Sequence, residues 1–265
     1  MKKLLLAAGV CAISWTPADA ADRLSGTWTT GGTAPQTFVF KAAGDAFGGV
    51  VCGPCDDPAS VFRVENGQFV DADHLTFSVA YDRGPARDRG PLLMTGTLSG
   101  NQLTLETRAD GRQASGVTTH LQRVVEGFAP DTSNVKGSNL LTADAAAPVS
   151  PIEGRWVAAG RNAQQNFVLK VRGQSVWGLI CGPCTPEGVF LIDDGSFDGT
   201  TMKFYINHID LPPASRAGVQ RNIMTGTLIG NVMKFKWVRE GAESQPGGEM
   251  TLIGPIRQDS ATATR

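Results

Sequence analysis

Apolar and polar residues alternate along most of the chain with a period of two. Phe77 and Val79 stand two positions apart in one segment, and Met94, Gly96 and Leu98 do so in another, with polar residues between them. Alternation of this kind predicts strands that bury one face and expose the other. Turn signals rich in Gly, Asn and Asp separate these segments, and no segment keeps a helical period for three turns. The pattern therefore predicts an all-β protein.

The second half of the chain repeats the first. The tetrapeptide CGPC occurs at 52–55 and again at 181–184, and the pentapeptide MTGTL occurs at 94–98 and unchanged at 224–228. Eight antiparallel strands are enough to close a small barrel without sheet edges, and each copy has room for about that number. We therefore expect two tandem antiparallel meander barrels of about eight strands each. In the first copy the strands are expected to begin near Trp28, Thr37, Phe47, Val61, Leu75, Leu92, Leu103 and Val117.

The N-terminus has the pattern of an export signal. Lys2 and Lys3 precede a short apolar run at 4–10, and the small residues Ala18 and Ala20 precede the expected cleavage point. This order predicts a signal peptide at 1–20 and a mature protein in the periplasm or outside the cell. The remaining chain is expected to form a first barrel repeat at 21–123, a linker at 124–151, a second barrel repeat at 152–257 and a flexible tail at 258–265.

Composition narrows the classes of partner. The net charge is −1, only 18% of the residues are charged, and Lys and Arg form no cluster along the sequence. These features argue against nucleic acid or an anionic membrane surface as the partner. After the signal peptide no apolar run is long enough to span a membrane. Because the chain has three histidines and no nucleotide-binding or catalytic consensus motif, we expect no cofactor and no metal site.

A Gly-x-Trp sequence opens each copy, at 26–28 and 154–156, and Arg123 closes the last strand of the first copy. This layout resembles that of the lipocalins and the wider calycin group. The resemblance implies a lipocalin-like cup for a small, largely apolar ligand, with the Trp at the closed end. The chain departs from the lipocalin pattern in carrying CGPC after its third strand.

Loop lengths predict which end of each barrel is the mouth. In a meander, successive loops alternate between the two ends. The turns after the second, fourth and sixth strands of the first copy are short, whereas the loops after the first, third, fifth and seventh are longer. Long loops gathered at one rim mark that rim as the open mouth. Both CGPC segments follow third strands, so both are expected at the mouths.

The CGPC segments allow four interpretations. Removal of the signal peptide, with Cys11, leaves the four cysteines Cys52, Cys55, Cys181 and Cys184. An even number of cysteines in an oxidising compartment, at a spacing that a tight turn can bridge, favours local disulfides. The alternatives are redox-active dithiols as in thioredoxins, a metal site of four cysteines, and disulfides between the copies. The aspartates at 56 and 57 disfavour a redox-active thiol because they would raise its pKa.

Two polar pairs are the candidates for catalysis. His208 and Asp210 share a strand face with Phe204, so the carboxylate could orient the imidazole as a general base. Tyr81 and Arg83 occupy the matching positions of the first copy. The alternative interpretation of His208 is a partly exposed residue at a strand end.

Three further residues are candidates for ligand contact. Phe47 and Trp177 precede the two CGPC segments, where each either lines a cavity or fills the core. Arg87 belongs to an arginine-rich loop that could hold a carboxylate or phosphate. The leading functional hypothesis is an exported binder of a small apolar or aromatic ligand at mouths stiffened by CGPC disulfides. The alternatives are a cofactor-independent lyase or isomerase that uses one of the two polar pairs, and a periplasmic thiol–disulfide protein that acts through CGPC.

Overall fold

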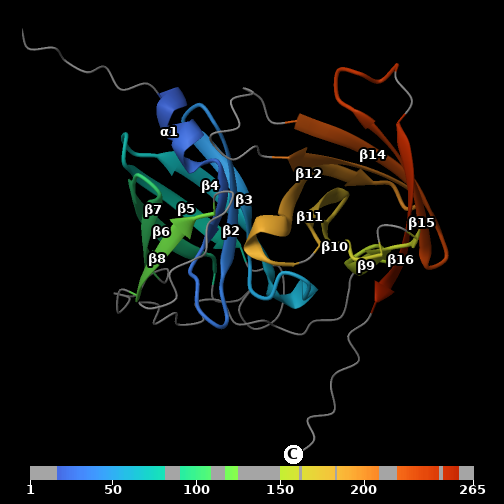
Figure 1. Ribbon diagram of the computed structural model, residues 1–265, viewed down its shortest axis with the longest axis horizontal. Coiled ribbons are helices and arrows are strands. Elements are labelled where there is room, and N and C mark those ends of the chain that lie inside the picture. Colours follow the sequence, from blue (N-terminus) through green and yellow to red (C-terminus); the bar gives the residue numbers. More distant parts are fainter. Residues whose placement is uncertain are drawn as a thin grey trace, which may run out of the picture.

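The protein folds as two closed antiparallel barrels of eight strands each (Figure 1). The structure is a computed structural model, and it describes residues 17–80, 90–108, 117–124, 150–160, 163–182, 184–208, 220–244 and 247–256. Every neighbouring pair of strands is consecutive along the chain, apart from the pair that closes each barrel. The expected all-β class and the two tandem meander barrels are confirmed.

The first barrel closes where β1 pairs with β8, with Trp28 opposite Arg123. Several expected strand starts, such as Thr37, Val61 and Leu92, are the observed ones. A short helix, α1 (Pro17–Leu24), precedes the barrel, and a single 3-10 turn, η1 (Pro58–Ser60), precedes its fourth strand. The strands are β1 (Gly26–Thr29), β2 (Thr37–Ala43), β3 (Ala46–Cys52), β4 (Val61–Phe69), β5 (His74–Ala80), β6 (Leu92–Ser99), β7 (Gln102–Arg108) and β8 (Val117–Arg123).

The second barrel repeats this layout and closes where β16 pairs with β9, with Leu252 opposite Ala158. A 3-10 turn, η4 (Pro186–Gly188), takes the place of η1. The strands are β9 (Gly154–Ala158), β10 (Asn166–Arg172), β11 (Ser175–Cys181), β12 (Val189–Phe197), β13 (Thr201–His208), β14 (Gln220–Ile229), β15 (Val232–Arg239) and β16 (Gly248–Ile256).

Large apolar side chains fill the interior of the first barrel. Phe40 lies between Phe47 and Phe77, with ring centroids 5.7 Å from each and edge-to-face geometry. Phe47 and Phe77 are themselves 5.8 Å apart. Edge-to-face contacts of this kind add to the free energy of burial. The interior is therefore a packed core along the described part of the barrel, in place of the deep cup that the lipocalin resemblance implies.

A tryptophan closes one end of each barrel, as the resemblance implies. Trp28 is buried, and its indole N–H donates to the Leu24 carbonyl of α1 at 2.8 Å. Trp156 makes the same bond to the Ile152 carbonyl at 2.8 Å. In the first barrel the Arg123 guanidinium also lies 5.8 Å from the centroid of the Trp28 ring.

The second barrel has no cation at the position of Arg123. Its last strand carries Gly254 there, and the amide of each of these two residues donates to the preceding hairpin turn, at Asn101 and Asn231. A Cβ on Gly254 would lie 3.0 Å from the Trp156 ring. Glycine therefore lets the backbone cover the indole that an arginine covers in the first barrel.

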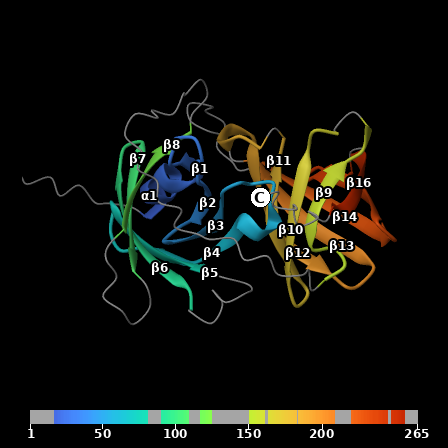
Figure 2. The same ribbon diagram turned by 90° about the horizontal axis from the view of Figure 1, so that it is seen from below.

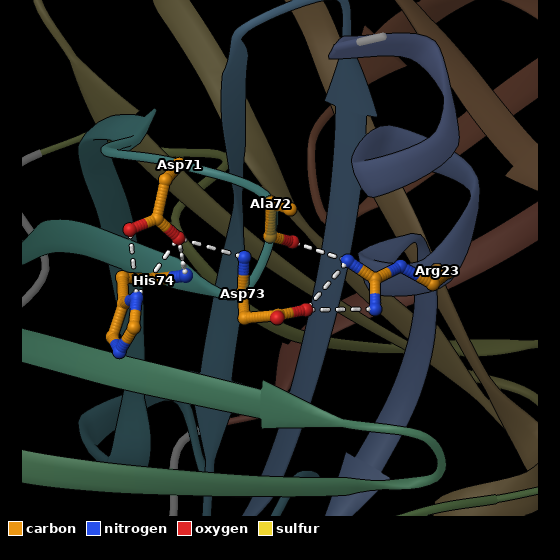
Figure 3. A network of polar contacts seen from close by, with 5 residues as sticks. All are labelled: Arg23, Asp71, Ala72, Asp73 and His74. Atoms are coloured by element: carbon orange, nitrogen blue, oxygen red, sulfur yellow. Dashed lines mark hydrogen bonds and ion pairs between the residues drawn. The ribbon is translucent and has the colours of Figure 1, made fainter. Parts of the chain in front are cut away.

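An ion pair fixes α1 to the turn between β4 and β5 (Figure 3). The Arg23 guanidinium lies 3.0 Å from the Asp73 carboxylate and also donates to the Ala72 carbonyl. In the same turn Asp71 accepts the backbone amides of Asp73 and His74 and contacts the His74 ring at 2.8 Å. The expected signal-peptide cleavage point, after residue 20, falls inside α1.

The two barrels meet along the walls formed by β2–β4 and β10–β12 (Figure 2). Lys41 Nζ lies 2.6 Å from the Asp193 carboxylate, and Arg172 lies 3.0 Å from Glu65. These pairs are reciprocal, because each joins the second strand of one barrel to the fourth strand of the other. Between them lies one apolar cluster made of outward-facing residues of both barrels. Its members are Val39, Val50, Cys52, Cys55, Val61, Val168, Trp177, Leu179, Cys181, Val189 and Leu191.

Candidate functional site

The meander topology places the loops after β1, β3, β5 and β7 at one end of the first barrel and the tight turns at the other. α1 and the Trp28 indole close the end of the tight turns. We call the other end, where the longer loops begin and end, the open rim, in keeping with the prediction made from loop lengths. Three of the candidate residues, Tyr81, Arg83 and Arg87, come between β5 and β6 in the sequence and lie outside the described residues. Their predicted roles therefore stay predictions.

Of the predicted pair His208 and Asp210, only the backbone of His208 is described, at the matching rim of the second barrel. His208 is the last residue of β13, where its backbone pairs with Gln220 of β14. Phe204 and Ile206, which share the predicted face with it, lie in the interior of the barrel. The side chain of His208 and all of Asp210 lie outside the described residues, so the general-base hypothesis stays a prediction.

Both CGPC segments form local disulfides. Cys52 is bonded to Cys55 and Cys181 to Cys184, with Cα atoms 4.8 and 4.6 Å apart. These separations lie in the range that disulfides tolerate. The leading interpretation of these segments is confirmed, and neither a disulfide between the copies nor a site of four thiolates is formed.

The disulfide segments also form part of the contact between the barrels. Cys181 Sγ lies 4.0 Å from the Cys55 carbonyl oxygen. Arg155 of β9 pairs with Asp56 at 3.3 Å, and the Lys170 ammonium donates to the Pro58 carbonyl at 3.1 Å. The first disulfide segment therefore presents two backbone carbonyls and a carboxylate to the second barrel, a role that the sequence did not indicate.

We expect no free thiol among these four cysteines in the folded protein. Denaturing the mature protein without reductant and treating it with iodoacetamide should add no carbamidomethyl group by intact mass. Reduction before alkylation should add one group per cysteine, which controls for reagent access. Modification without reductant would contradict the disulfides described above.

Phe47 and Trp177 lie on opposite faces of their barrels. Phe47 packs inside the first barrel, whereas Trp177 faces outward into the apolar cluster between the barrels. The Arg63 guanidinium of the first barrel lies 5.9 Å from the Trp177 ring centroid. By the register of the ladders, Gly49 and Gly178 are equivalent, so the counterpart of Phe47 is Val176. Trp177 therefore contributes to the joint between the barrels.

The open end of the second barrel carries an aromatic residue that we did not single out in the sequence. Trp237 follows the interior residues Met233 and Phe235 on the same face of β15, and 36% of its surface is exposed. It pairs with Gly248 of β16, where an added Cβ would lie 2.2 Å from the indole nitrogen. The indole therefore occupies the space that a side chain at 248 would need.

At the position equivalent to Trp237, the rim of the first barrel carries a polar residue. Met94 pairs with Thr107 in the first barrel and Met224 pairs with Trp237 in the second, so these partners are equivalent. Thr107 is only 7% exposed, and its hydroxyl has no hydrogen-bond partner among the described residues. The amide oxygen of Gln36, in the loop after β1, is likewise buried without a partner in that part of the chain. One rim is thus aromatic and the other polar.

Among the described residues, three carboxylates have clearly lowered pKa values: Asp71 and Asp198 in tight turns, and Glu243 between β15 and β16, where it accepts the Gly241 amide. Hydrogen bonds from the backbone amide of Asp73 and from His74 lower the pKa of Asp71. Amides of Thr201 and Thr200 lower the pKa of Asp198 in the same way. Both carboxylates stabilise turns at the closed ends. Within the described part of the chain, no group of three or more potential metal ligands is found.

Comparisons with known proteins leave the family open. No family model matches the chain, and no curated protein matches it. Among solved structures, a putative outer membrane protein from Bacteroides fragilis is similar with 13% sequence identity, covering 88% of this chain and 97% of that one. Its TM-score of 0.23 is too low to support an inference. In the part of the chain that the structure describes, no helix combines the length and hydropathy needed to cross a bilayer.

Proposed function

We propose that this protein is an exported binding protein that takes a small apolar or aromatic molecule at the open rim of its second barrel. The signal-peptide pattern at 1–20 and the two local disulfides support export to an oxidising compartment. The observation that carries the binding proposal is the partly exposed Trp237 indole at that rim.

The surroundings of Trp237 suit an apolar guest. Phe190 and Met250 are only partly buried and pack on the apolar cluster inside the second barrel. Met250 pairs with Phe235, which precedes Trp237 by two positions on the same face of β15. A tryptophan side chain has few rotatable bonds, so it offers a large contact area and loses little conformational entropy on binding. Tryptophan is accordingly common among the residues that contribute most of the binding energy. Since the interiors are packed, the guest lies on the rim.

The rim should bind a neutral aromatic probe. We expect N-phenyl-1-naphthylamine to fluoresce on the mature protein, and Trp237→Ala to weaken its binding about tenfold, or 1.4 kcal/mol. Gly248→Val should weaken binding as well, because the new side chain displaces the indole. Trp237→Phe should retain most of the affinity, since it keeps an aromatic face.

Thr107→Ala is the matched control, because it changes the equivalent position of the first barrel. Circular dichroism should show intact folds for all variants. Equal probe binding by the parent and Trp237→Ala would place the site elsewhere and remove the proposal. Whichever result is obtained, mass spectrometry of small molecules retained by the purified protein identifies the natural ligand class.

A further inference from the structure

A shallow hollow lies on the outer face of the second barrel, away from the joint between the barrels. It begins one residue from Trp237, but on the opposite face of β15. It has a volume of about 500 Å³ and spans β14, β15 and β16. Such a volume suffices for the head and first carbons of a small ligand. Its outward-facing lining comprises Thr225, Thr227, Ile229, Lys234, Lys236 and Thr251, together with Glu249.

Two ammonium groups in the hollow are available to an anion. Lys234 has no ion pair with any residue that the structure describes. Lys236 lies 4.0 Å from the Glu249 carboxylate, and both side chains are about 80% exposed. An exposed ion pair at this distance contributes little free energy. Lys236 can therefore turn from Glu249 to a bound anion at small cost.

An apolar row borders the same hollow. Ile229 is 60% exposed and Ile253 46% exposed, although isoleucine normally favours the interior. Val232 pairs with both of them across the ladder, so the three side chains lie side by side on three strands. Exposed apolar side chains that gather beside a hollow mark a binding surface more often than single ones do.

The first barrel shows that the fold requires none of these residues. The register of β7 and β8 places Ser99, Gln102 and Gln122 where the second barrel has Ile229, Val232 and Ile253. The same register places Thr104 at the position of Lys234 and Glu106 at the position of Lys236. One scaffold therefore carries a polar face in the first barrel and an apolar face with two lysines in the second.

We propose that this outer hollow binds a single-chain anionic amphiphile, such as a long-chain carboxylate. Its anionic head lies between Lys234 and Lys236, and its chain covers the row of Ile229, Val232 and Ile253. A neutral apolar molecule would leave the lysines unused, and a small anion would leave the row exposed. The combination of the two features selects the amphiphile. This site is separate from the rim at Trp237.

Calorimetry with dodecanoate below its micelle concentration tests the proposal on the mature protein. Lys234→Thr combined with Lys236→Glu installs the residues of the first barrel, and we expect it to weaken binding at least tenfold. Ile229→Ser combined with Ile253→Gln should weaken it by a similar factor. Raising the salt concentration should weaken binding to the parent, because the head group is held by exposed charges.

Four comparisons decide the outcome. Butyrate should bind far more weakly than dodecanoate if the apolar row holds the chain. Lys234→Thr combined with Lys236→Glu should leave N-phenyl-1-naphthylamine binding unchanged, which separates this site from the rim. Unchanged binding by the lysine variant would overturn the proposal. Binding to vesicles of anionic phospholipid without binding to monomeric dodecanoate would also overturn it, in favour of a membrane surface.

Discussion

Replacing Trp28 or Trp156 with alanine is expected to lower the free energy of unfolding by about 3–5 kcal/mol. Each indole is fully buried at the closed end of its barrel and donates its N–H to a backbone carbonyl. Truncation leaves a cavity and an unpaired buried acceptor, and both effects add to the lost burial.

The effect should be larger at Trp28 than at Trp156. The Arg123 guanidinium lies over the Trp28 ring, whereas the glycine backbone at 254 lies against Trp156. Loss of the cation–π contact adds about 0.5–1 kcal/mol. Guanidinium unfolding followed by circular dichroism measures the difference, with Trp→Phe at each site as the conservative control. A parent-like midpoint for either alanine variant would show that the indole does not close that barrel.

Gly49→Ala and Gly178→Ala should each cost at least about 4 kcal/mol, or prevent the affected barrel from folding. An added Cβ would lie 1.9 Å from the Val39 carbonyl oxygen in the first barrel and 1.9 Å from that of Val168 in the second. Both glycines sit where the register shifts by a β-bulge on the third strand of the barrel. The clash is with backbone of the neighbouring strand, which cannot rotate away as a side chain can.

Gly44→Ala and Gly173→Ala are controls for a positive φ without a steric clash. Both glycines have φ of +63° in tight turns, and neither has an atom within 4 Å of an added Cβ. These variants should therefore lose only about 1–2 kcal/mol, the cost of a left-handed conformation. If Gly49→Ala and Gly44→Ala lose the same amount, strand contact at the bulge is not the reason for glycine there.

The alternation of residues and the repeat were enough to predict the barrels. A period of two with regular turn signals fixes strand positions locally, and the duplicated CGPC and MTGTL segments fix the domain count. Local disulfides were predictable for the same reason, since a spacing of three residues needs no knowledge of the fold. These features depend on neighbours along the chain.

The joint between the barrels was not predicted, because its ion pairs join residues far apart in sequence. Lys41 and Asp193 are separated by 152 positions. One signal was present: residues 38–40 and 50–52 are unbroken apolar runs, which are typical of strands buried on both faces. Such runs explain why Val39 packs against the opposite barrel while its neighbours pack inside.

The candidate site was only partly accessible from the sequence. Tyr81 and Asp210 were chosen from strand periodicity in segments outside the described residues. Trp237 was missed although it continues the face of Met233 and Phe235, because its importance depends on Gly248 in the neighbouring strand. The lysines beside the hollow were also missed, since two lysines on one strand form no cluster in the linear sequence.

The reciprocal contacts between the barrels have a genetic consequence. In a symmetric dimer of identical chains, every substitution appears on both sides of the interface at once. Here the two halves are encoded separately, so Lys41 can change without altering Lys170, which holds the equivalent position in the second barrel. A duplicated gene of this kind can lose a function in one half and acquire another there, while the other half keeps the assembly folded. Because the two halves change independently, equivalent positions can carry different residues, as Trp237 and Thr107 do at the two rims.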